Sequence, residues 1–216
     1  MQIFSLDSPV MNFLSRIADL MILNLLFILC CLPIVTIGAS TTALYSVTLK
    51  MAKNEESYIA KSFFQAFKDN FKFSTVSWLL GLLIAVIIVV DYNVSPQLSS
   101  PFSNILMFFI TALTIFYLFE MLYLFPYIAR FDNTFINTVK NAALISILNL
   151  PYTFLMIIIL AAAVVISMFV SFSISGIVWI LCGFSLIAYI NSLLFRRIFS
   201  KYEMGPEESE IQESEN

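Results

Sequence analysis

The sequence predicts an all-α protein, a polytopic transmembrane helical bundle with five long or near-full spans, one short bent element and a cytoplasmic amphipathic helix. Sixty per cent of its residues are apolar and 12% are charged, whereas soluble proteins have about 45 to 50% and about 25%. The mean hydropathy is +0.93. Several uncharged runs are also long enough to cross a hydrocarbon layer of about 30 Å.

The charges divide the chain into two parts. Residues 203–216 hold six Glu and no Lys or Arg, whereas residues 1–202 hold 11 basic and 8 acidic residues. We therefore expect a single integral membrane domain over 1–202 and an acidic cytoplasmic tail over 203–216. The composition of the tail is typical of disorder.

The first predicted element is a short hairpin over 9–52. Its centre is an uncharged run of 30 residues, Leu20 to Leu49, which as one helix would be about 45 Å long, too long for one crossing and too short for two. Pro33 and Gly38 favour a bend within it. If the run crosses once, Arg16 lies outside, whereas a hairpin places all 11 basic residues on one side. We favour the hairpin.

An amphipathic helix is predicted over 57–72. Apolar residues recur at spacings of three and four, and Lys61, Lys68 and Lys72 fall on the opposite face. Lysines and phenylalanines arranged in this way suit a helix that lies in an anionic membrane surface. We therefore assign the three lysines to the membrane surface.

The next predicted hairpin covers 73–130. Its first span, Phe73 to Val90, is uncharged, and Ser77, Gly81 and Ala85 recur in it every four residues. Small residues at this spacing let two helices pack closely in lipid. The loop over 91–101 has no basic residue, and a second span, Phe102 to Ile128, follows it.

The last predicted hairpin covers 141–197. The 54 residues from Asn141 to Leu194 carry no charge, which is enough for two spans joined near Ser171 to Gly176. Basic residues lie before and after the hairpins but not in the loops at their tips. By the positive-inside rule, the basic loops and the C-terminus are cytoplasmic and the protein lies in the cell membrane.

Four polar residues form a candidate intramembrane site: Asp19, Asn24, Thr36 and Glu120. Glu120 lies about 15 Å of helix before Arg130, and a charged acid at such depth costs about 3 kcal/mol. It either hydrogen-bonds a neighbour such as Asn24, Asn149 or Asn191, or it lines a path for an ion, proton or substrate.

The other three residues have structural interpretations. Asp19 lies one turn after Arg16 and can form an ion pair with it. Asn24 can join two helices. Thr36 lies in the Pro33–Ser40 bend, which either exposes backbone groups to a ligand or has those groups satisfied by its own hydroxyl side chains.

The sequence has no residues that favour an enzyme. It contains no His, the commonest general base and metal ligand, and no nucleotide-binding, hydrolase or metal-ligand motif. Its three Cys lie in apolar runs and are expected to be reduced. We expect no enzymatic activity, no cofactor and no nucleic-acid partner.

The chain as far as about Tyr202 resembles the YesL-like integral membrane proteins of Gram-positive bacteria, a family of unknown function, and the recognisable motif lies in the first 75 residues. The resemblance is carried by the segment LPIVTIGAS, the helix SFFQAFKDNFK, and the Asp and Asn of the first span, which occur together and in order. It implies an accessory role in carbohydrate uptake or its sensing. It supplies no catalytic residues, and the chain lacks the coupling motif of a classical ABC permease.

Our leading hypothesis is therefore an accessory or regulatory subunit that docks in the membrane to carbohydrate ABC transporter subunits or to a sensor kinase, through small-residue faces such as that of Ser77, Gly81 and Ala85. It would also contact membrane lipids and could self-associate. The alternative is a stand-alone small transporter or channel with Glu120 in its pathway.

Overall fold

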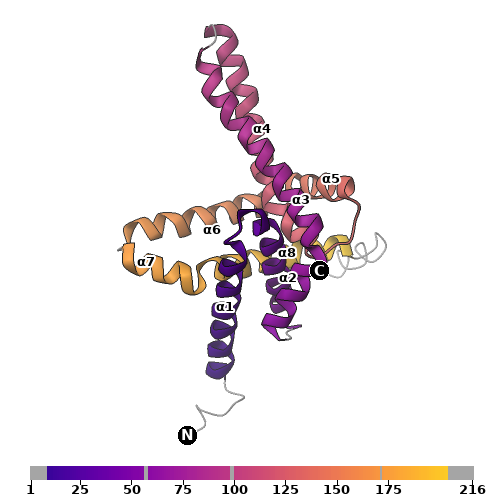
Figure 1. Ribbon diagram of the computed structural model, residues 1–216, viewed down its shortest axis with the longest axis vertical. Helices are drawn as coiled ribbons and strands as arrows, with labels where there is room; N and C mark the ends of the chain where they lie inside the picture. The colour runs from indigo at the N-terminus through magenta and orange to yellow at the C-terminus, as the bar shows by residue number, and fades with distance from the viewer. Residues whose placement is uncertain (1–8, 56–57, 98–99, 171, 204–216) are drawn as a thin grey trace.

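The described part of the computed structural model, residues 9–55, 58–97, 100–170 and 172–203, consists of helices and turns with no strand (Figure 1). The α-helices are α1 (Pro9–Cys31), α2 (Ile37–Lys53), α3 (Ile59–Val94), α4 (Ser100–Ile128), α5 (Phe135–Leu148), α6 (Leu150–Phe169), α7 (Phe172–Val178) and α8 (Phe184–Glu203). Two 3₁₀ turns, η1 (Ile34–Thr36) and η2 (Ser95–Gln97), and a π-helix, η3 (Trp179–Gly183), connect some of them. Except for Glu203, the predicted acidic tail lies outside the described residues.

Within the described residues, five helical segments are long and apolar enough to cross a membrane. They agree with the predicted class, an all-helical protein with five long spans. The segments are Phe13–Cys31, Ile59–Gln97, Pro101–Ile128, Leu150–Phe169 and Ser173–Tyr202.

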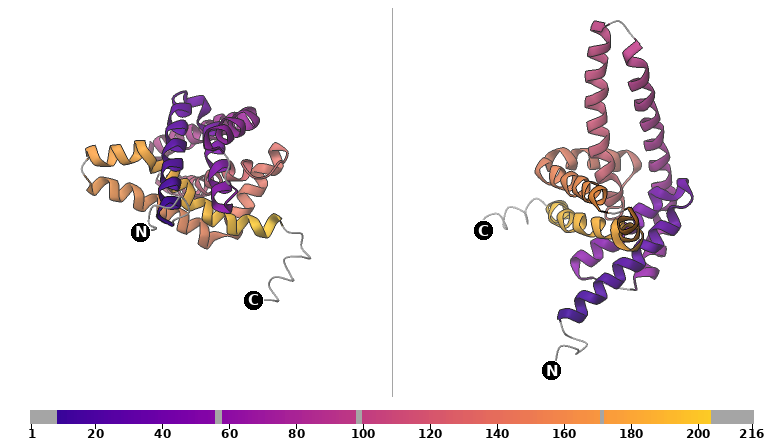
Figure 2. Two further views of the ribbon diagram at one scale, coloured as in Figure 1. Left: turned by 90° about the horizontal axis from the view of Figure 1, so that it is seen from below. Right: turned by 90° about the vertical axis from the view of Figure 1, so that its left-hand side faces the viewer.

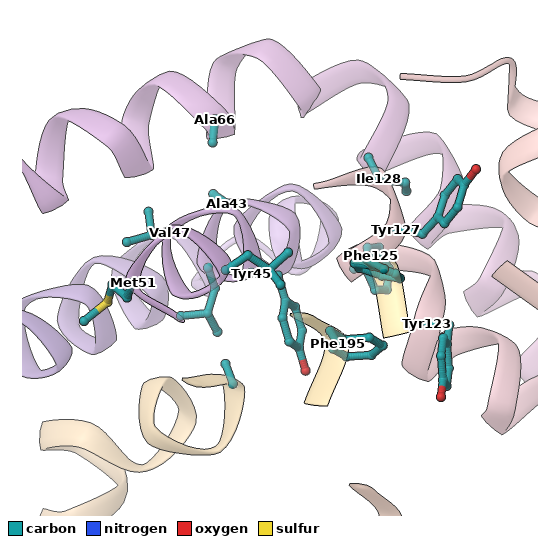
Figure 3. Packing of buried hydrophobic residues seen from close by; sticks show 14 of the residues in the cluster. Ala43, Tyr45, Val47, Met51, Ala66, Tyr123, Phe125, Tyr127, Ile128 and Phe195 are labelled. Atoms are coloured by element: carbon teal, nitrogen blue, oxygen red, sulfur yellow. The ribbon is translucent and has the colours of Figure 1, made fainter. Parts of the chain in front are cut away.

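The core is built around α2, the second half of the opening apolar run. Thirteen of its 17 residues are buried, and α1, α3, α4 and α8 all contact it. On one side, small residues such as Ala43 face Ala66 of α3, and on another Tyr45 packs edge-to-face on Phe195 of α8, with ring centroids 5.9 Å apart (Figure 3). Phe195 packs in the same way on Tyr123 of α4, at 5.0 Å.

The opening run is bent, as predicted. Helix α1 ends at Cys31, and η1 follows Pro33, whose backbone is extended. Because proline lacks an N–H and restricts the residue before it, it separates the two helices. Helix α2 then returns alongside α1, so the run is a helical hairpin.

The predicted boundary between an amphipathic helix and a separate span is wrong. Residues 59–94 form one helix of 36 residues, about 54 Å long at 1.5 Å per residue. No proline or glycine lies near Phe73 to interrupt the backbone hydrogen bonds. The apolar face of its first half packs against α2, and Phe63 is completely buried there.

The predicted start of the last hairpin at Asn141 is also wrong. Helix α5 already begins at Phe135, and the chain leaves helical geometry at Asn149, whose φ is −114°. Pro151 accounts for the break, because it has no N–H to donate to the preceding turn and its ring would clash with the carbonyl of Ile147 in a continuous helix. The turn between α6 and α7 is shorter than expected, since residues 172–176 are already helical.

Two helical hairpins project from the core in different directions (Figures 1 and 2). The outer parts of α3 and α4 form one arm, and α6 with α7 forms the other. The predicted hairpins are thus present but do not all lie side by side. Their outer surfaces carry large aliphatic and aromatic side chains, which gain little from packing on one another rather than on lipid.

Candidate functional site

Polar side chains join three helices at one end of the core. Arg16 of α1 donates a hydrogen bond of 2.7 Å to the Tyr189 hydroxyl of α8 and another to Oδ1 of Asn54, which follows α2. Arg196 of α8 donates one of 2.7 Å to the carbonyl oxygen of Ala52. The start of α1 and the end of α2 therefore lie at the same end, the geometry of the hairpin interpretation.

Asn24 binds the π-helix η3. Its side-chain nitrogen donates to the carbonyl oxygens of Trp179 and Ile180, at 3.0 and 2.7 Å, and its side-chain oxygen accepts from the Ser185 backbone N–H at 2.9 Å. Asn24 is fully buried. Both side-chain N–H groups therefore donate to backbone carbonyl oxygens of the π-helix. This is the helix-joining role considered for Asn24.

Thr36 satisfies the backbone of the bend. Its hydroxyl lies 2.6 Å from the Cys30 carbonyl oxygen and 2.7 Å from that of Pro33. A hydroxyl proton can serve either acceptor, so Thr36 supplies a donor where the helix has lost its own. Thr42, farther along, instead bonds Ser74 of α3 at 2.8 Å. The hydroxyls of Thr36 and Thr42 thus have structural partners, whereas the buried Ser40 hydroxyl has no hydrogen-bond partner within the described residues.

Asp19 and Glu120 are each half-buried, on α1 and α4 respectively. Two of the partners considered for Glu120 are bonded elsewhere. Both N–H groups of Asn24 point to η3, and those of Asn149 point to the Ile145 carbonyl and the Tyr202 hydroxyl. Asn24 and Thr36 lie at separate contacts, Asn24 at η3 and Thr36 within the bend.

The small-residue face of α3 is occupied within the chain. A Cβ placed on Gly81 would lie 2.8 Å from the terminal methyl of Met121, and the Tyr117 hydroxyl donates to the Gly81 carbonyl at 3.0 Å. Ser77 is also buried, and Ala85 is half-buried. Gly81 therefore packs against α4 within the chain, on the face where we expected a partner helix to dock.

The side chains of Lys61, Lys68 and Lys72 are exposed along one face of α3. The opposite, apolar face is covered by α2 and not free to enter a membrane surface. Phe64 and Phe71 stay exposed beside the lysines, with 43% and 41% of their surface accessible. Any lipid contact of residues 59–72 must therefore use the lysine side and these two rings.

Two cavities lie outside these contacts. One, of about 240 Å³, is lined mainly by apolar residues of α6, α7, η3 and α8. The other, of about 510 Å³, lies between α1 and the segment 182–189 and includes Arg16. Neither is lined by Glu120 or by the bend. Among the described residues, no group of three or more His, Cys, Asp or Glu could hold a metal ion.

Arg16 is the residue whose role the sequence did not indicate. The sequence predicts for Arg16 only a place at the membrane boundary and an ion pair with Asp19. Its position as the first basic residue of an apolar span signals a membrane boundary, but its contacts to Tyr189 and Asn54 join positions distant in sequence. No local spacing predicts such contacts.

Residues 20–92 match a family described as "Protein of unknown function, DUF624". The chain is also 26% identical over 122 residues to the uncharacterised protein YesL of Bacillus subtilis. The resemblance to YesL-like proteins is confirmed. The matched segment spans 56% of this chain and 57% of its YesL-like relative, so a little over half of each is compared. No solved structure matches the chain.

Proposed function

We propose that this YesL-like protein is a non-enzymatic accessory or regulatory subunit of the cell membrane, which docks on a partner membrane complex through an exposed stripe on α4. The carbohydrate part of the proposal, a partner that is an ABC transporter or a sensor of carbohydrate uptake, comes from the family resemblance alone.

The stripe is the observation that carries the docking proposal. It consists of Phe102, Ile105, Phe109, Ala112 and Phe116, all of them exposed and alternately three and four residues apart. This spacing keeps the side chains on one face of a helix, and it is the spacing of knobs-into-holes packing. The small Ala112 among large rings leaves a hole for a side chain of another helix.

The stripe lies on a side of α4 that the chain does not cover. Tyr117 and Met121 of α4 contact Gly81 of α3, and the stripe lies about a third of a turn around the helix from them. Only 6% of the most apolar window of α4 is buried. A helix of a partner could therefore lie along the stripe without displacing α3.

Glu120 continues the stripe, four residues after Phe116. A half-buried carboxyl at the inner end of an apolar seam offers a hydrogen-bond acceptor or donor to a partner helix. Buried polar residues in such seams fix register and partner choice. In this account Glu120 is a specificity residue of the interface.

Two adjacent phenylalanines provide the test. Phe108 and Phe109 are 71% and 64% exposed, but only Phe109 belongs to the stripe. A photo-reactive residue is placed at each position in the native host, and cross-linked proteins are identified by mass spectrometry. We expect a transporter or sensor subunit at position 109 and a yield at least about fivefold lower at 108. Equal yields, or cross-links only to the same protein, would contradict the proposal.

The alternative is a stand-alone transporter or channel with its path past Glu120. Reconstituted protein that carries a flux abolished by Glu120→Gln would favour it. The accessory proposal expects no flux in either form, while Glu120→Gln weakens partner cross-linking at position 109.

A further inference from the structure

Three lysines, Lys61, Lys68 and Lys72, are exposed along one side of α3, over about 17 Å of helix. None of them forms an ion pair with another residue of the described ranges. The three lysines and the exposed Asp69 leave the stretch 61–72 with a charge of +2. The described residues therefore leave positive charge on this side of α3 available to a further group.

Two aromatic rings accompany the lysines. Phe64 and Phe71 are 43% and 41% exposed, and each follows a lysine by three residues, a spacing that places the ring beside the lysine on the helix surface. We call the three lysines and these two rings the lysine face. A segment that fits this face carries several negative charges with an apolar side chain among them.

The chain itself contains a segment of that chemistry, residues 204–216, which follows α8 and lies outside the described residues. It has five Glu and no Lys or Arg, and the aliphatic Ile211 lies between Glu210 and Glu213. Its charge is opposite to that of the lysine face, and its one large aliphatic side chain complements the two exposed rings.

The last turns of α8 lie near the lysine face. The Phe199 ring of α8 packs on Phe131, in the connection between α4 and α5, with centroids 5.2 Å apart. Phe73, directly after the last lysine of the face, packs on Phe135 at the start of α5, at 5.6 Å. Both helices therefore contact the same short part of the chain. Fully extended, the thirteen residues 204–216 span at most about 43 to 47 Å, more than twice the length of the lysine face.

We propose that residues 204–216 bind the lysine face of α3 in the same molecule. The Glu side chains pair with the lysines, and Ile211 packs on the exposed rings. Single ion pairs on a protein surface are weak, but a tethered segment has an effective concentration in the millimolar range, so several weak pairs suffice. While the segment is bound, the lysine face is closed to anionic lipid headgroups.

A photo-reactive phenylalanine derivative in place of Ile211 tests the proposal. The purified full-length protein is reconstituted in phosphatidylcholine, whose headgroups carry no net charge, and cross-linked peptides are identified by mass spectrometry. We expect cross-links to residues 62–72 of the same molecule. Their yield should fall at least about fivefold in about 1 M salt, where charges are screened within about 3 Å.

Two neutralised variants show whether the lysine face is specific. Replacing its lysines together, as Lys61→Gln, Lys68→Gln and Lys72→Gln, should lower the yield at least about fivefold, because the pairs are lost. The matched control removes the same charge from exposed positions of α5 and α8 and should leave the yield within about twofold of the wild type. It consists of Lys140→Gln, Arg197→Gln and Lys201→Gln.

Charge reversal gives a test that does not depend on loss alone. Glutamates at the three positions, Lys61→Glu, Lys68→Glu and Lys72→Glu, should abolish the cross-link. Adding Glu207→Lys, Glu208→Lys and Glu210→Lys should restore it, because opposite charges then face each other again. An unfolded variant could not recover in this way.

Four results would overturn the proposal. They are cross-links from position 211 only to lipid or to α8, equal loss in the two neutralised variants, and no recovery after charge reversal on both sides. The fourth is cross-links to residues 62–72 of a second molecule, which a mixture of isotope-labelled and unlabelled protein reveals. The test needs no partner protein, so it can fail or succeed separately from the docking proposal.

Discussion

Asn24 illustrates what a single buried amide contributes to this chain. All its hydrogen-bonding groups are used on η3 and on the start of α8, so it fixes the register of α1 on a segment more than 150 residues away. A polar residue deep in an apolar span indicates a helix contact. The sequence could not indicate the partner, because the contact joins Asn24 to backbone groups more than 150 residues away and no local spacing predicts such a contact.

Asn24→Leu should lower the stability of the protein by about 1 to 3 kcal/mol, because two carbonyls and one N–H lose their partner in a buried place. The thermal unfolding midpoint in one detergent measures the effect. Asn93→Leu is the matched control, since Asn93 is exposed and bonds only the Val89 carbonyl one turn earlier. Equal midpoints for the two variants would show that the Asn24 contacts contribute little.

Glu120 differs from Asn24, because two of the amide side chains expected to hydrogen-bond it are bonded to other groups. Asn24 and Asn149 are both committed to other groups. Glu120→Gln should therefore change the free energy of unfolding by no more than about 0.5 kcal/mol, which is typical of sites outside buried networks. A loss comparable to that of Asn24→Leu would make Glu120 a structural residue and remove it from the proposed interface.

At the scale of elements, the bend between α1 and α2 was predicted and the surroundings of α3 were not. Pro33, Gly38 and the length of the uncharged run are local features of the sequence, and they predicted the bend that the structure has. The apolar residues of 59–72 recur with the helical period of 3.6, and the segment is helical. This periodicity shows which face of the helix is apolar, but not whether lipid or protein covers that face. Here α2 covers it, and the buried Phe63 lies in the core.

Gly38 is a position at which α2 and α3 approach closely. An added Cβ would overlap the Ser74 carbonyl oxygen and lie 2.6 Å from the Trp78 Cβ and 3.1 Å from the Phe125 ring. Because the Ser74 contact is with backbone, the helices would have to separate. Gly38→Ala should therefore lower stability by about 1 to 3 kcal/mol.

Gly176→Ala is the control for that change. No atom lies within 4 Å of its added Cβ, and it is inside α7, so alanine should raise stability by about 0.5 to 1 kcal/mol. Unfolding midpoints of both variants in the same detergent give the comparison. Stabilisation by both would mean that α2 and α3 are not in close contact at Gly38.

At the scale of the molecule, one core holds two apolar arms and one polar end. Hydropathy predicted five of the spans because it depends only on composition along the chain. Contacts between distant segments determine the directions of the arms, the central burial of α2 and the cavity at Arg16. Local sequence patterns do not predict such contacts. The same is true of Gly81, which contacts Tyr117 and Met121 of α4.

The central claim is that the start of α1, the end of α2 and the end of α8 share one side of the membrane, the cytoplasmic one. Single cysteines at Ser15, Gln97 and Lys201, in a protein without its three native cysteines, can be labelled with an impermeant maleimide in intact and in permeabilised cells. We expect labelling at Gln97 in intact cells, and at Ser15 and Lys201 only after permeabilisation. Labelling of Ser15 in intact cells, with Lys201 protected, would contradict the account.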